Sequence, residues 1–320
     1  EADWKDAVEP RQVRLVCLVE IALLIGGAND LAAVFASRLA EIAARAEADS
    51  IVSAAWIRYV NAMRALYVER DHAAALTRLQ MALKLLEQIG DPNAYSSRVL
   101  LAQLWLDAGD LGAAEQLLET CMRPGTSGGN ELTINLARGY HALLLARQGR
   151  GDEATAQATE VRDRWLRDSD PFFAAFGRKL LARVFAECGH LEAAEDEGRA
   201  AVEALAKFPP HQVTALARLA RVLVARGQPR EALEMAERAQ AMYAKGLGAL
   251  EAAAPVDLAM AEALHASGDL ARARAWIEDA RQRLRLRAEK MAPDRRSAYL
   301  EGAPEHARIE QLAAEWTSLL

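Results

Sequence analysis

The sequence repeats a short pattern about every forty residues, and this period constrains the fold more than any other feature. In each copy, a small or polar residue is followed five positions later by alanine. A fixed period of this length is typical of stacked helical repeats, because each helix pair buries its apolar face only against its neighbours. The chain is therefore expected to hold another molecule on a long surface. The copies are Gly27 with Ala32, Arg70 with Ala75, Gly109 with Ala114, Gly149 with Ala154, Gly189 with Ala194, Gly227 with Ala232, Gly268 with Ala273, and Gly302 with Ala307.

The composition favours helices throughout the chain. Apolar residues make up 52% of the sequence but aromatic residues only 6%, so the core must be built mainly from alanine and leucine, which are strong helix formers. The sequence has no long alternation of apolar and polar residues and no Asn-Gly or Asp-Gly hairpin turn. We predict an all-α fold, a right-handed superhelical α-solenoid of about eight antiparallel helix pairs that forms a single domain over residues 1–320.

Local signals at the turns agree with helix pairs. The glycine of each copy is expected to end the first helix, since a left-handed residue caps a helix there without steric cost. Asp110, Asp152 and Asp269 follow soon after such glycines, and we expect each near the start of the second helix. Arg70 stands where glycine is expected. We therefore predict a different turn in that copy, with Asp71 starting the next helix.

The ends and one joint of the array carry their own signals. Residues 123–130 include the run Pro-Gly-Thr-Ser-Gly-Gly, and we expect a local bend there. Ile309, Leu312, Trp316 and Leu319 recur at helical spacing, which predicts either a terminal cap on repeat seven or a surface for a following domain. The first residue is glutamate and not methionine, so we expect the chain to be a segment of a longer protein.

Charge, hydropathy and cysteine content exclude several classes of protein. A net charge of −6 and a pI near 5.7 disfavour a nucleic-acid reader, which needs a basic surface. The longest apolar stretch, residues 15–28, contains Glu20 and is too short to span a bilayer. Cys17, Cys121 and Cys188 lie far apart in apolar helical sequence, which predicts reduced core residues. We expect a cytoplasmic protein with no nucleic-acid or membrane partner.

Motifs for catalysis or metal binding are not recognisable. His-Glu-x-x-His and Gly-x-Ser-x-Gly are absent, and the glycine-rich residues 125–129 lack the Lys-Ser/Thr of a phosphate-binding loop. The carboxylate pairs Glu195/Glu197 and Asp168/Asp170 are expected to be solvated. We predict a non-enzymatic protein without a cofactor or metal. Surface or capping roles are expected for most of the histidines, which are His72, His141, His190, His211, His265 and His306.

The repeat resembles the tetratricopeptide (TPR) pattern over nearly the whole chain, from about residue 11 to 320. Gly109, Ala114 and the small Cys121 have its spacing, and the bulky Trp105 stands three residues after the small Ala102 on the first helix. The period is longer than the 34 residues of a TPR, which implies longer helices, and the usual closing proline is missing. Long-period arrays of this kind resemble the sensor or scaffold segments of large bacterial signalling ATPases, LuxR-type ATP-dependent regulators and multidomain Ser/Thr kinases.

The resemblance implies where a partner would bind. In TPR proteins that clamp peptides, the first helix of each repeat lines a concave groove, and the position six residues before the turn glycine points into it. Here this position and its neighbours carry several cations, so we expect a cationic groove for an acidic peptide segment or an anionic small ligand. In the alternative interpretation these cations pair with Glu and Asp of adjacent repeats. The expected groove residues are Arg64, Gln103, Lys179, Arg183, Arg218 and Arg221.

One strongly basic run also admits two interpretations. It is either a long solvated helix with scattered ion pairs or a docking patch for an acidic partner. The run comprises Arg281, Arg283, Arg285, Arg287, Lys290, Arg295 and Arg296.

Two classes of function follow from the resemblance. The first is a non-enzymatic protein–protein interaction scaffold of bacterial signalling or regulation, which binds a protein or peptide segment in the groove. The second is a small-molecule effector-sensing domain of a multidomain transcriptional regulator or kinase. An aromatic cluster in the groove would favour the second class, and Tyr67, Tyr140 and Phe176 are candidates although they are spread over three repeats.

The cationic groove leads to a prediction for mutagenesis. Replacing Arg183 and Arg221 together by alanine should weaken partner binding without lowering the melting temperature, because groove residues that serve a ligand need not stabilise the fold. Loss of folding in the double variant, seen by circular dichroism, would argue against the ligand role.

Overall fold

Helices account for all regular structure in the part of the chain that is described. The computed structural model describes residues 9–123, 129–168 and 170–317, and these ranges contain fifteen α-helices and no strand. The all-α prediction is therefore confirmed. Residues 124–128, where the bend was expected, lie outside the described ranges, as does Leu319.

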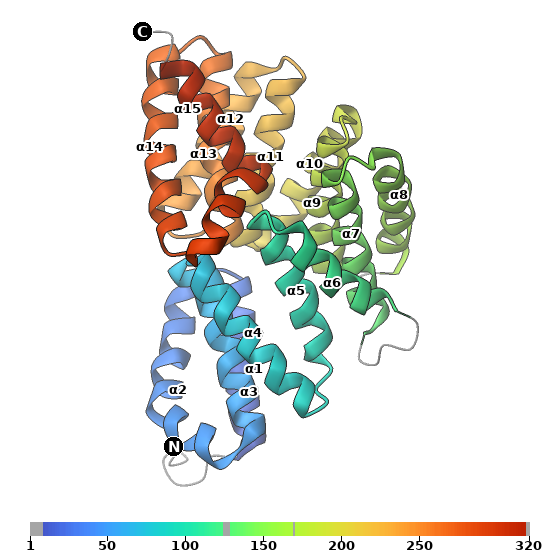
Figure 1. The fold of residues 1–320 in the computed structure, drawn as a ribbon, viewed down its shortest axis with the longest axis vertical. Coiled ribbons are helices and arrows are strands. Elements are labelled where there is room, and N and C mark those ends of the chain that lie inside the picture. Colours follow the sequence, from blue (N-terminus) through green and yellow to red (C-terminus); the bar gives the residue numbers. More distant parts are fainter. Residues whose placement is uncertain (1–8, 124–128, 169, 318–320) are drawn as a thin grey trace.

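Seven antiparallel helix pairs follow one another within the described ranges, and each pair packs on the next (Figure 1). The first helices also pack on one another and form the inner layer of the array. They are α1 (Pro10–Ile25), α3 (Ile51–Arg64), α5 (Asn93–Asp107), α7 (Glu131–Arg147), α9 (Pro171–Glu187), α11 (Pro209–Ala225) and α13 (Ala253–Ala266). The second helices are α2 (Asn29–Asp49), α4 (His72–Gln88), α6 (Leu111–Met122), α8 (Gly151–Asp168), α10 (Leu191–Ala204), α12 (Pro229–Ala244) and α14 (Leu270–Glu289).

The turns of these pairs have the predicted chemistry. Six of the turn glycines have φ between 72° and 86°, the left-handed region in which glycine meets no steric penalty. The alanines five residues later, from Ala32 to Ala273, are at most 2% exposed because the second helix packs there on the first. Asp110 and Asp269 accept hydrogen bonds from the backbone N–H groups of Ala113 and Arg272, which caps α6 and α14.

The turn at Arg70 differs from the others, as predicted. The last residues of that first helix widen into the π-helix η1 (Ala65–Glu69). Arg70 then takes the left-handed conformation itself, with φ of 50°, and its guanidinium lies over the ring of Tyr243 at 4.6 Å from the centroid. Asp71 caps α4 through the backbone N–H of Ala74. A cation–π contact and a helix cap thus accompany the conformation that glycine adopts elsewhere.

The eighth copy of the pattern is not a full helix pair. Gly302 lies in the short π-helix η5 (Ala298–Gly302) and has no left-handed φ, because this glycine does not end a long first helix. The closing helix α15 (Pro304–Thr317) packs on α13 and α14 with Ile309 and Leu312 buried. The indole of Trp316 stacks on His265 with ring centroids 4.5 Å apart. Within the described residues, α15 therefore acts as the predicted terminal cap on the seventh pair.

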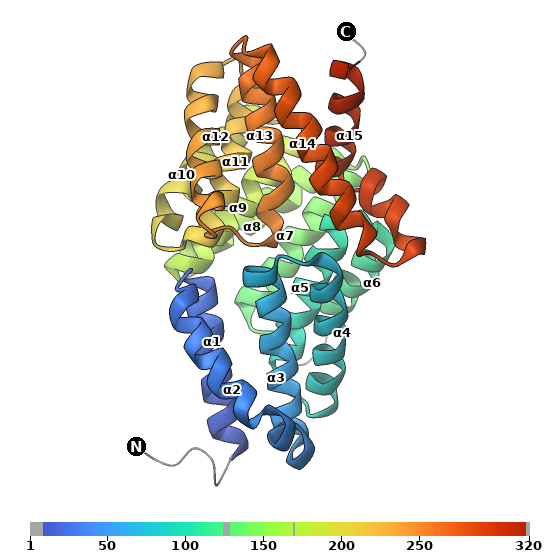
Figure 2. The same ribbon diagram turned by 90° about the vertical axis from the view of Figure 1, so that its left-hand side faces the viewer.

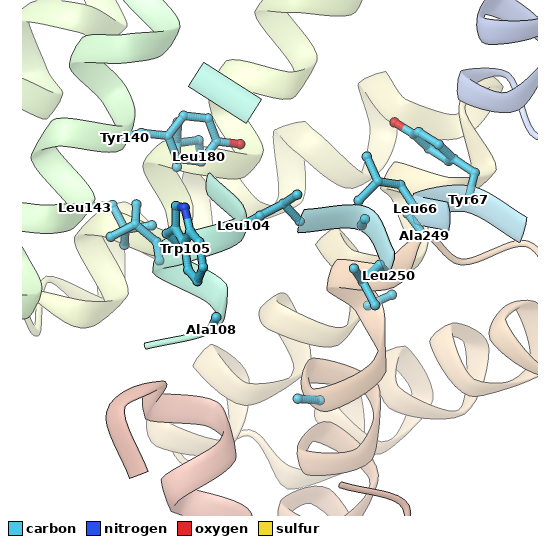
Figure 3. Close-up of a cluster of buried hydrophobic side chains, with 14 of the residues drawn as sticks. Leu66, Tyr67, Leu104, Trp105, Ala108, Tyr140, Leu143, Leu180, Ala249 and Leu250 are labelled. Carbon is cyan, nitrogen blue, oxygen red and sulfur yellow. The ribbon is translucent and has the colours of Figure 1, made fainter. Parts of the chain in front are cut away.

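The array curves until its later repeats meet its earlier ones. At the N-terminal side, the amide of Asn29 donates a hydrogen bond to the carbonyl of Gly246, and the turn at Gly27 faces the ring of Pro210. Figure 2 shows the blue helices α1 and α2 below the yellow and orange ribbon of the later repeats. Leu66 and Tyr67 also lie beside Ala249 and Leu250, which precede and begin η3 (Leu250–Ala252) (Figure 3).

A second closure involves residues 290–305, here called the clasp. The clasp lies across the turns before α4 and α6, as the orange-red ribbon beside α4 and α5 shows (Figure 1). Lys290 Nζ pairs with Asp71 at 2.9 Å, and Arg295 pairs with Asp110. Gly302 packs directly on the backbone of Gly109. The clasp thereby joins the seventh and eighth copies of the repeat to the second and third.

Two glycines with the same backbone angle provide a test of this closure. Gly109 and Gly189 both have φ of 81°, but a Cβ on Gly109 would lie 2.5 Å from the backbone nitrogen of Ala303, whereas one on Gly189 would have no atom within 4 Å. Gly189→Ala should cost roughly 1–2 kcal/mol of unfolding free energy, from backbone strain alone. Gly109→Ala should cost about 1–3 kcal/mol more, because the clasp must move. Urea unfolding of both variants measures the difference, and equal losses would contradict the closure.

Candidate ligand-binding groove

The predicted groove residues fall into two places. Arg64 lies at the end of α3, where its Nη2 donates to Glu20 Oε2 at 2.7 Å and Nη1 donates to Asn61. The other five come from α5, α9 and α11, the inner helices in the middle of the array. The structure therefore brings together Gln103, Lys179, Arg183, Arg218 and Arg221, and it places Arg64 apart from them.

Arg183 is buried and only 4% exposed. Its Nη1 donates to Asp107 Oδ1 at 2.8 Å, and its Nη2 donates to the Glu305 carboxylate at 3.1 and 3.3 Å. Its Nε donates to Glu187 at 3.2 Å. Burial alone would lower the pKa of Arg183, but these carboxylates outweigh it and raise the pKa well above the usual value. One guanidinium thus joins α5, α9 and α15.

This enclosure changes what the Arg183 part of the double variant should do. Breaking a buried ion pair by removing one partner costs about 3–5 kcal/mol, because the remaining charge stays buried without compensation. We therefore expect Arg183→Ala to lower the melting temperature, contrary to the expectation from sequence. Among the described residues, Arg221 pairs with Glu262 alone, at 2.8 Å, and its side chain is 29% exposed. Arg221 is the position that tests binding without disturbing the core.

A second polar cluster lies toward the N-terminal side of the groove. Lys179 pairs with Glu251, and Glu251 also accepts a hydrogen bond from Gln103 Nε2 at 3.0 Å. Gln103 in turn accepts one from the Tyr140 hydroxyl at 2.6 Å. Burial favours a higher pKa for Glu251, but Lys179 and a hydrogen bond from His211 bring it well below the usual value. Glu251 is therefore an ionised carboxylate at the centre of the cluster.

Aromatic rings that are distant in sequence meet at His211. Its Nε2 is 3.2 Å from the Tyr67 hydroxyl, and the rings of Phe176 and Phe172 pack edge-on against it. Burial, followed by the nearby Lys179 charge, lowers the pKa of His211. Its Nδ1 lies 3.4 Å from Lys179 Nζ and 3.6 Å from the Glu251 carboxylate. Of the predicted aromatic cluster, Tyr67 and Phe176 come together here, while Tyr140 joins the neighbouring Gln103.

Glu305 is the residue that sequence reasoning missed. It lies at the N-terminus of α15, where the clasp inserts it among the inner helices. Besides Arg183, it has Arg147 at 3.5 Å and Arg218 at 3.8 Å. Burial would raise its pKa, but these arginines bring it well below the usual value. The groove cations therefore already hold a carboxylate, which comes from a segment outside the seven helix pairs.

Part of this network could have been predicted from the residues that stand two positions before the turn glycine. Asp107, Arg147 and Glu187 occupy it in three consecutive repeats, with alternating charge. In the structure, Arg147 donates to Glu187 at 3.0 and 3.1 Å, and its Nη1 donates to the carbonyl of Leu106. Opposite charges at equivalent positions of adjacent repeats thus predict inter-repeat pairs. Glu251 and Glu305 lie outside the repeat register, so this signal does not reach them.

Several expectations about polar residues were wrong. His72, His211 and His306 are buried, because their ring nitrogens find partners inside the array: His72 bonds the Leu104 carbonyl and His306 the Tyr299 carbonyl. Glu195 and Glu197 were expected to be solvated but are buried by the arginines that pair with them, Arg199 and Arg226 for the first and Arg178 for the second.

The cysteines are free thiols, and the residues of the basic run have partners within the protein. Cys17 and Cys121 are free and buried, and burial raises the pKa of the two thiols to about 12 and about 11. Cys188 is free and half-buried. The residues of the basic run pair with carboxylates or backbone carbonyls, which fits a helix with ion pairs.

Among the described residues, no group of three or more His, Cys, Asp or Glu could hold a metal ion. None of the described helices is both long and apolar enough to cross a membrane.

Two cavities lie along the groove and share Arg183, Arg218 and Glu305. The axial cavity, of about 100 Å³, lies between α5, α11, α13 and the clasp. The lateral cavity, of about 230 Å³, lies between α9, α10 and α11 and also reaches Lys179 and Arg221. Apolar side chains such as those drawn in Figure 3 form much of the surrounding core. The groove is thus lined by cations along its length, with internal carboxylates between them.

Comparison with known proteins agrees with the repeat architecture. The family model of the tetratricopeptide repeat matches residues 96–120, 213–238 and 254–279, which cover parts of the third, sixth and seventh helix pairs. The match thus identifies repeats of the tetratricopeptide type in these three segments of the chain. No curated protein sequence matches the chain significantly.

Solved structures with a similar fold include two Rap proteins, one in complex with a factor and one with a peptide, and one signal transduction ATPase. A Rap protein complexed with competence and sporulation factor is 13% identical, with a TM-score of 0.57 over 97% of this chain and 98% of that chain. The Rap conjugation gene regulator of plasmid pLS20, in complex with the Phr* peptide, is 14% identical, with a TM-score of 0.55 over 84% and 76%.

The signalling ATPase is a STAND protein with a tetratricopeptide repeat sensor from Pyrococcus horikoshii. It is 15% identical, with a TM-score of 0.55, and the match covers 98% of this chain but 46% of that one. At these identities, the three likenesses concern the fold alone.

The buried imidazole of His306 leads to a prediction about pH. Burial lowers the pKa of His306 from 6.5 to about 4, with Arg287 and His72 adding to the effect and Glu305 opposing it. Because the unfolded chain binds the proton more tightly, this residue should remove on the order of 3 kcal/mol of stability as the pH falls from about 6.5 to about 4. His306→Gln, which keeps a donor for the Tyr299 carbonyl, should flatten that part of the curve. Urea unfolding at several pH values measures it, and an unchanged pH dependence in the variant would contradict the prediction.

Proposed function

We propose that the chain is a non-enzymatic interaction module that binds an acidic segment of a partner protein in its concave groove. The partner's carboxylates would bind Lys179, Arg183, Arg218 and Arg221. In this proposal the module serves bacterial signalling or regulation in the cytoplasm, as a single solenoid within a larger protein.

One observation carries this proposal: the groove already binds a carboxylate of the chain itself. Glu305 reaches Arg183, Arg147 and Arg218 from the N-terminus of a helix that follows the last full repeat. Charge-assisted hydrogen bonds of this kind are strong and directional, so the same cations suit a carboxylate on a foreign helix or extended segment. The partner would then compete with the clasp, and displacement of Glu305 would accompany binding. The two Rap structures with bound factor or peptide support binding of a peptide by this fold.

A second function is favoured by the convergence of Tyr67 and Phe176 on His211, all of which line the axial cavity. In this alternative, the chain is the effector-sensing domain of a larger regulator or kinase, and a small molecule binds inside the groove. The STAND protein with a repeat sensor supports this role for the fold. Because the clasp closes the array, binding of a ligand in the groove would affect the clasp and, through it, the end of the array.

The first function predicts binding of acidic peptides with a defined charge dependence. A fluorescein-labelled library of glutamate-rich peptides should bind the chain, and a matched library with glutamine in place of glutamate should not. Arg221→Gln should weaken binding about tenfold, as expected for loss of one charge-assisted hydrogen bond. Glu305→Gln should strengthen binding, because it removes the internal competitor. Fluorescence anisotropy at low and high salt measures each affinity, and high salt should weaken binding.

The matched control is Arg199→Gln. Like Arg221, Arg199 pairs with glutamate, in its case with Glu195 and Glu231. Arg199 lies on α10, a second helix, outside the groove. Its loss should leave peptide binding unchanged. Equal binding of the glutamine library, or equal effects of the Arg221 and Arg199 variants, would refute the acidic-segment proposal.

A further inference from the structure

The axial cavity contains a buried arginine whose charge is poorly compensated. Arg218 donates no hydrogen bond within the described residues, and its Nε is buried without a partner. Its nearest carboxylate oxygen, Glu305 Oε1, is 3.8 Å away and is held more closely by Arg183, at 3.1 Å. A buried donor without an acceptor is costly, and native structures normally satisfy such groups with protein, water or ligand. Arg218 thus marks a place where a hydrogen-bond acceptor is missing.

The neighbouring cations do not share this deficit. Lys179 has Glu251, Arg221 has Glu262 at 2.8 Å, and Arg147 has Glu187 at 3.0 Å. Arg183 has Asp107 at 2.8 Å besides its contacts with Glu305 and Glu187. Each of these four cations thus has a carboxylate of its own, which leaves Glu305 for Arg218. One positive charge remains on Arg287, because its nearest carboxylate, Asp257, is held at 2.6 Å by Arg283. A ligand with a single negative charge would balance it.

Two more buried polar atoms without partners belong to side chains that line the same cavity. Asp107 uses Oδ1 for Arg183, whereas its Oδ2 has no hydrogen-bond donor. Arg287 Nη2 likewise has no hydrogen-bond partner, and its nearest carboxylate oxygen is Asp257 Oδ2 at 3.7 Å. These atoms come from α5 and α14, while Arg218 belongs to α11. The cavity is therefore surrounded by two unmatched donors and one unmatched acceptor from three separate elements.

We propose that the axial cavity binds a small hydroxycarboxylate. The carboxylate would accept hydrogen bonds from Arg218 and Arg287, and the hydroxyl would donate to Asp107 Oδ2. A neutral donor fits better than an ammonium, because a zwitterion would leave the charge of Arg287 unbalanced. This site rests on the effector-sensing function, and it does not require peptide binding.

The volume of the cavity sets the size of this ligand. About 100 Å³ holds at least about three water-sized groups of ~30 Å³ each, which matches an acid of roughly two to four carbon atoms. A peptide segment is too large for it. The lining of the cavity also includes Leu100, Leu104 and Pro255, which would contact the carbon chain. Because Glu305 and Tyr299 of the clasp also line the cavity, an occupied site would hold the clasp closed.

Isothermal titration calorimetry of the chain with four three-carbon compounds tests the ligand chemistry. Glycerate should bind saturably, and propionate, which lacks the hydroxyl, should bind about tenfold more weakly. Glycerol and alanine should bind more weakly than propionate, because the first has no charge and the second no net charge. Absence of saturable glycerate binding would overturn the proposal and leave water as the occupant. Tighter binding of alanine than of glycerate would overturn the neutral-donor assignment.

Three variants test the residues of the site. Arg218→Gln should weaken glycerate binding about tenfold or more. Asp107→Asn should remove the preference for glycerate over propionate, because the amide presents a donor where the carboxylate presents an acceptor. Circular dichroism checks that both variants fold, and the comparison of glycerate with propionate on the unaltered chain tests the site independently of them. A glycerate affinity that is the same with and without Arg218 would overturn the site.

Arg221→Gln is the matched control, since Arg221 lines the lateral cavity but not the axial one. It should bind glycerate as the unaltered chain does while losing acidic peptides. Failure of peptide binding with intact glycerate binding would therefore reject only the groove proposal, and the reverse would reject only the hydroxycarboxylate site.

Discussion

The buried contact between Arg183 and Glu305 connects the parts of this structure that are far apart along the chain. Arg183 belongs to the fifth helix pair and also holds Asp107 of the third, while Glu305 belongs to the segment that follows the seventh. Both side chains lie where the curvature of the array brings its inner helices and the clasp together. Buried charges need this mutual compensation, because each alone would be strongly destabilising in the interior. The position of the clasp and the shape of both cavities therefore depend on this contact.

Closure distinguishes this solenoid from an open repeat array. In an open array each repeat contacts only its neighbours, and stability is approximately a sum of local terms. Here the second and third repeats also contact the clasp through Asp71, Gly109 and Asp110. A ligand that enters the groove has to fit within a ring. In the two proposals, a peptide would displace the clasp and a small acid would stabilise it. The two ligands would thus have opposite effects on the contact between Arg183 and Glu305.

The candidate site shows how far sequence reasoning reaches. The cations on the inner helices were predictable where they occur at a fixed distance from the turn glycine, as Arg183 and Arg221 do. Four of the five predicted cations lie together with Gln103. The pairing of Arg147 with Glu187 follows from opposite charges at equivalent positions of adjacent repeats. The partners of Arg183 do not follow from any repeat, since Asp107 and Glu305 are 76 and 122 residues away in the sequence. The meeting of Tyr67 with His211, 144 residues apart, is equally invisible to a pattern of forty residues.

The sequence by itself determined the helix pairs, their turns and their stacking, because these depend on interactions within a repeat or between neighbours. Glycine in the left-handed region, aspartate at helix N-termini and buried alanines act over a few residues, so their spacing is readable directly. Tertiary structure alone decided that the array closes, that α15 places Glu305 among the arginines, and that Arg218 is left without a close partner. These outcomes depend on the summed curvature of the seven helix pairs. Every packing contact contributes a little to this curvature, and no single residue encodes it.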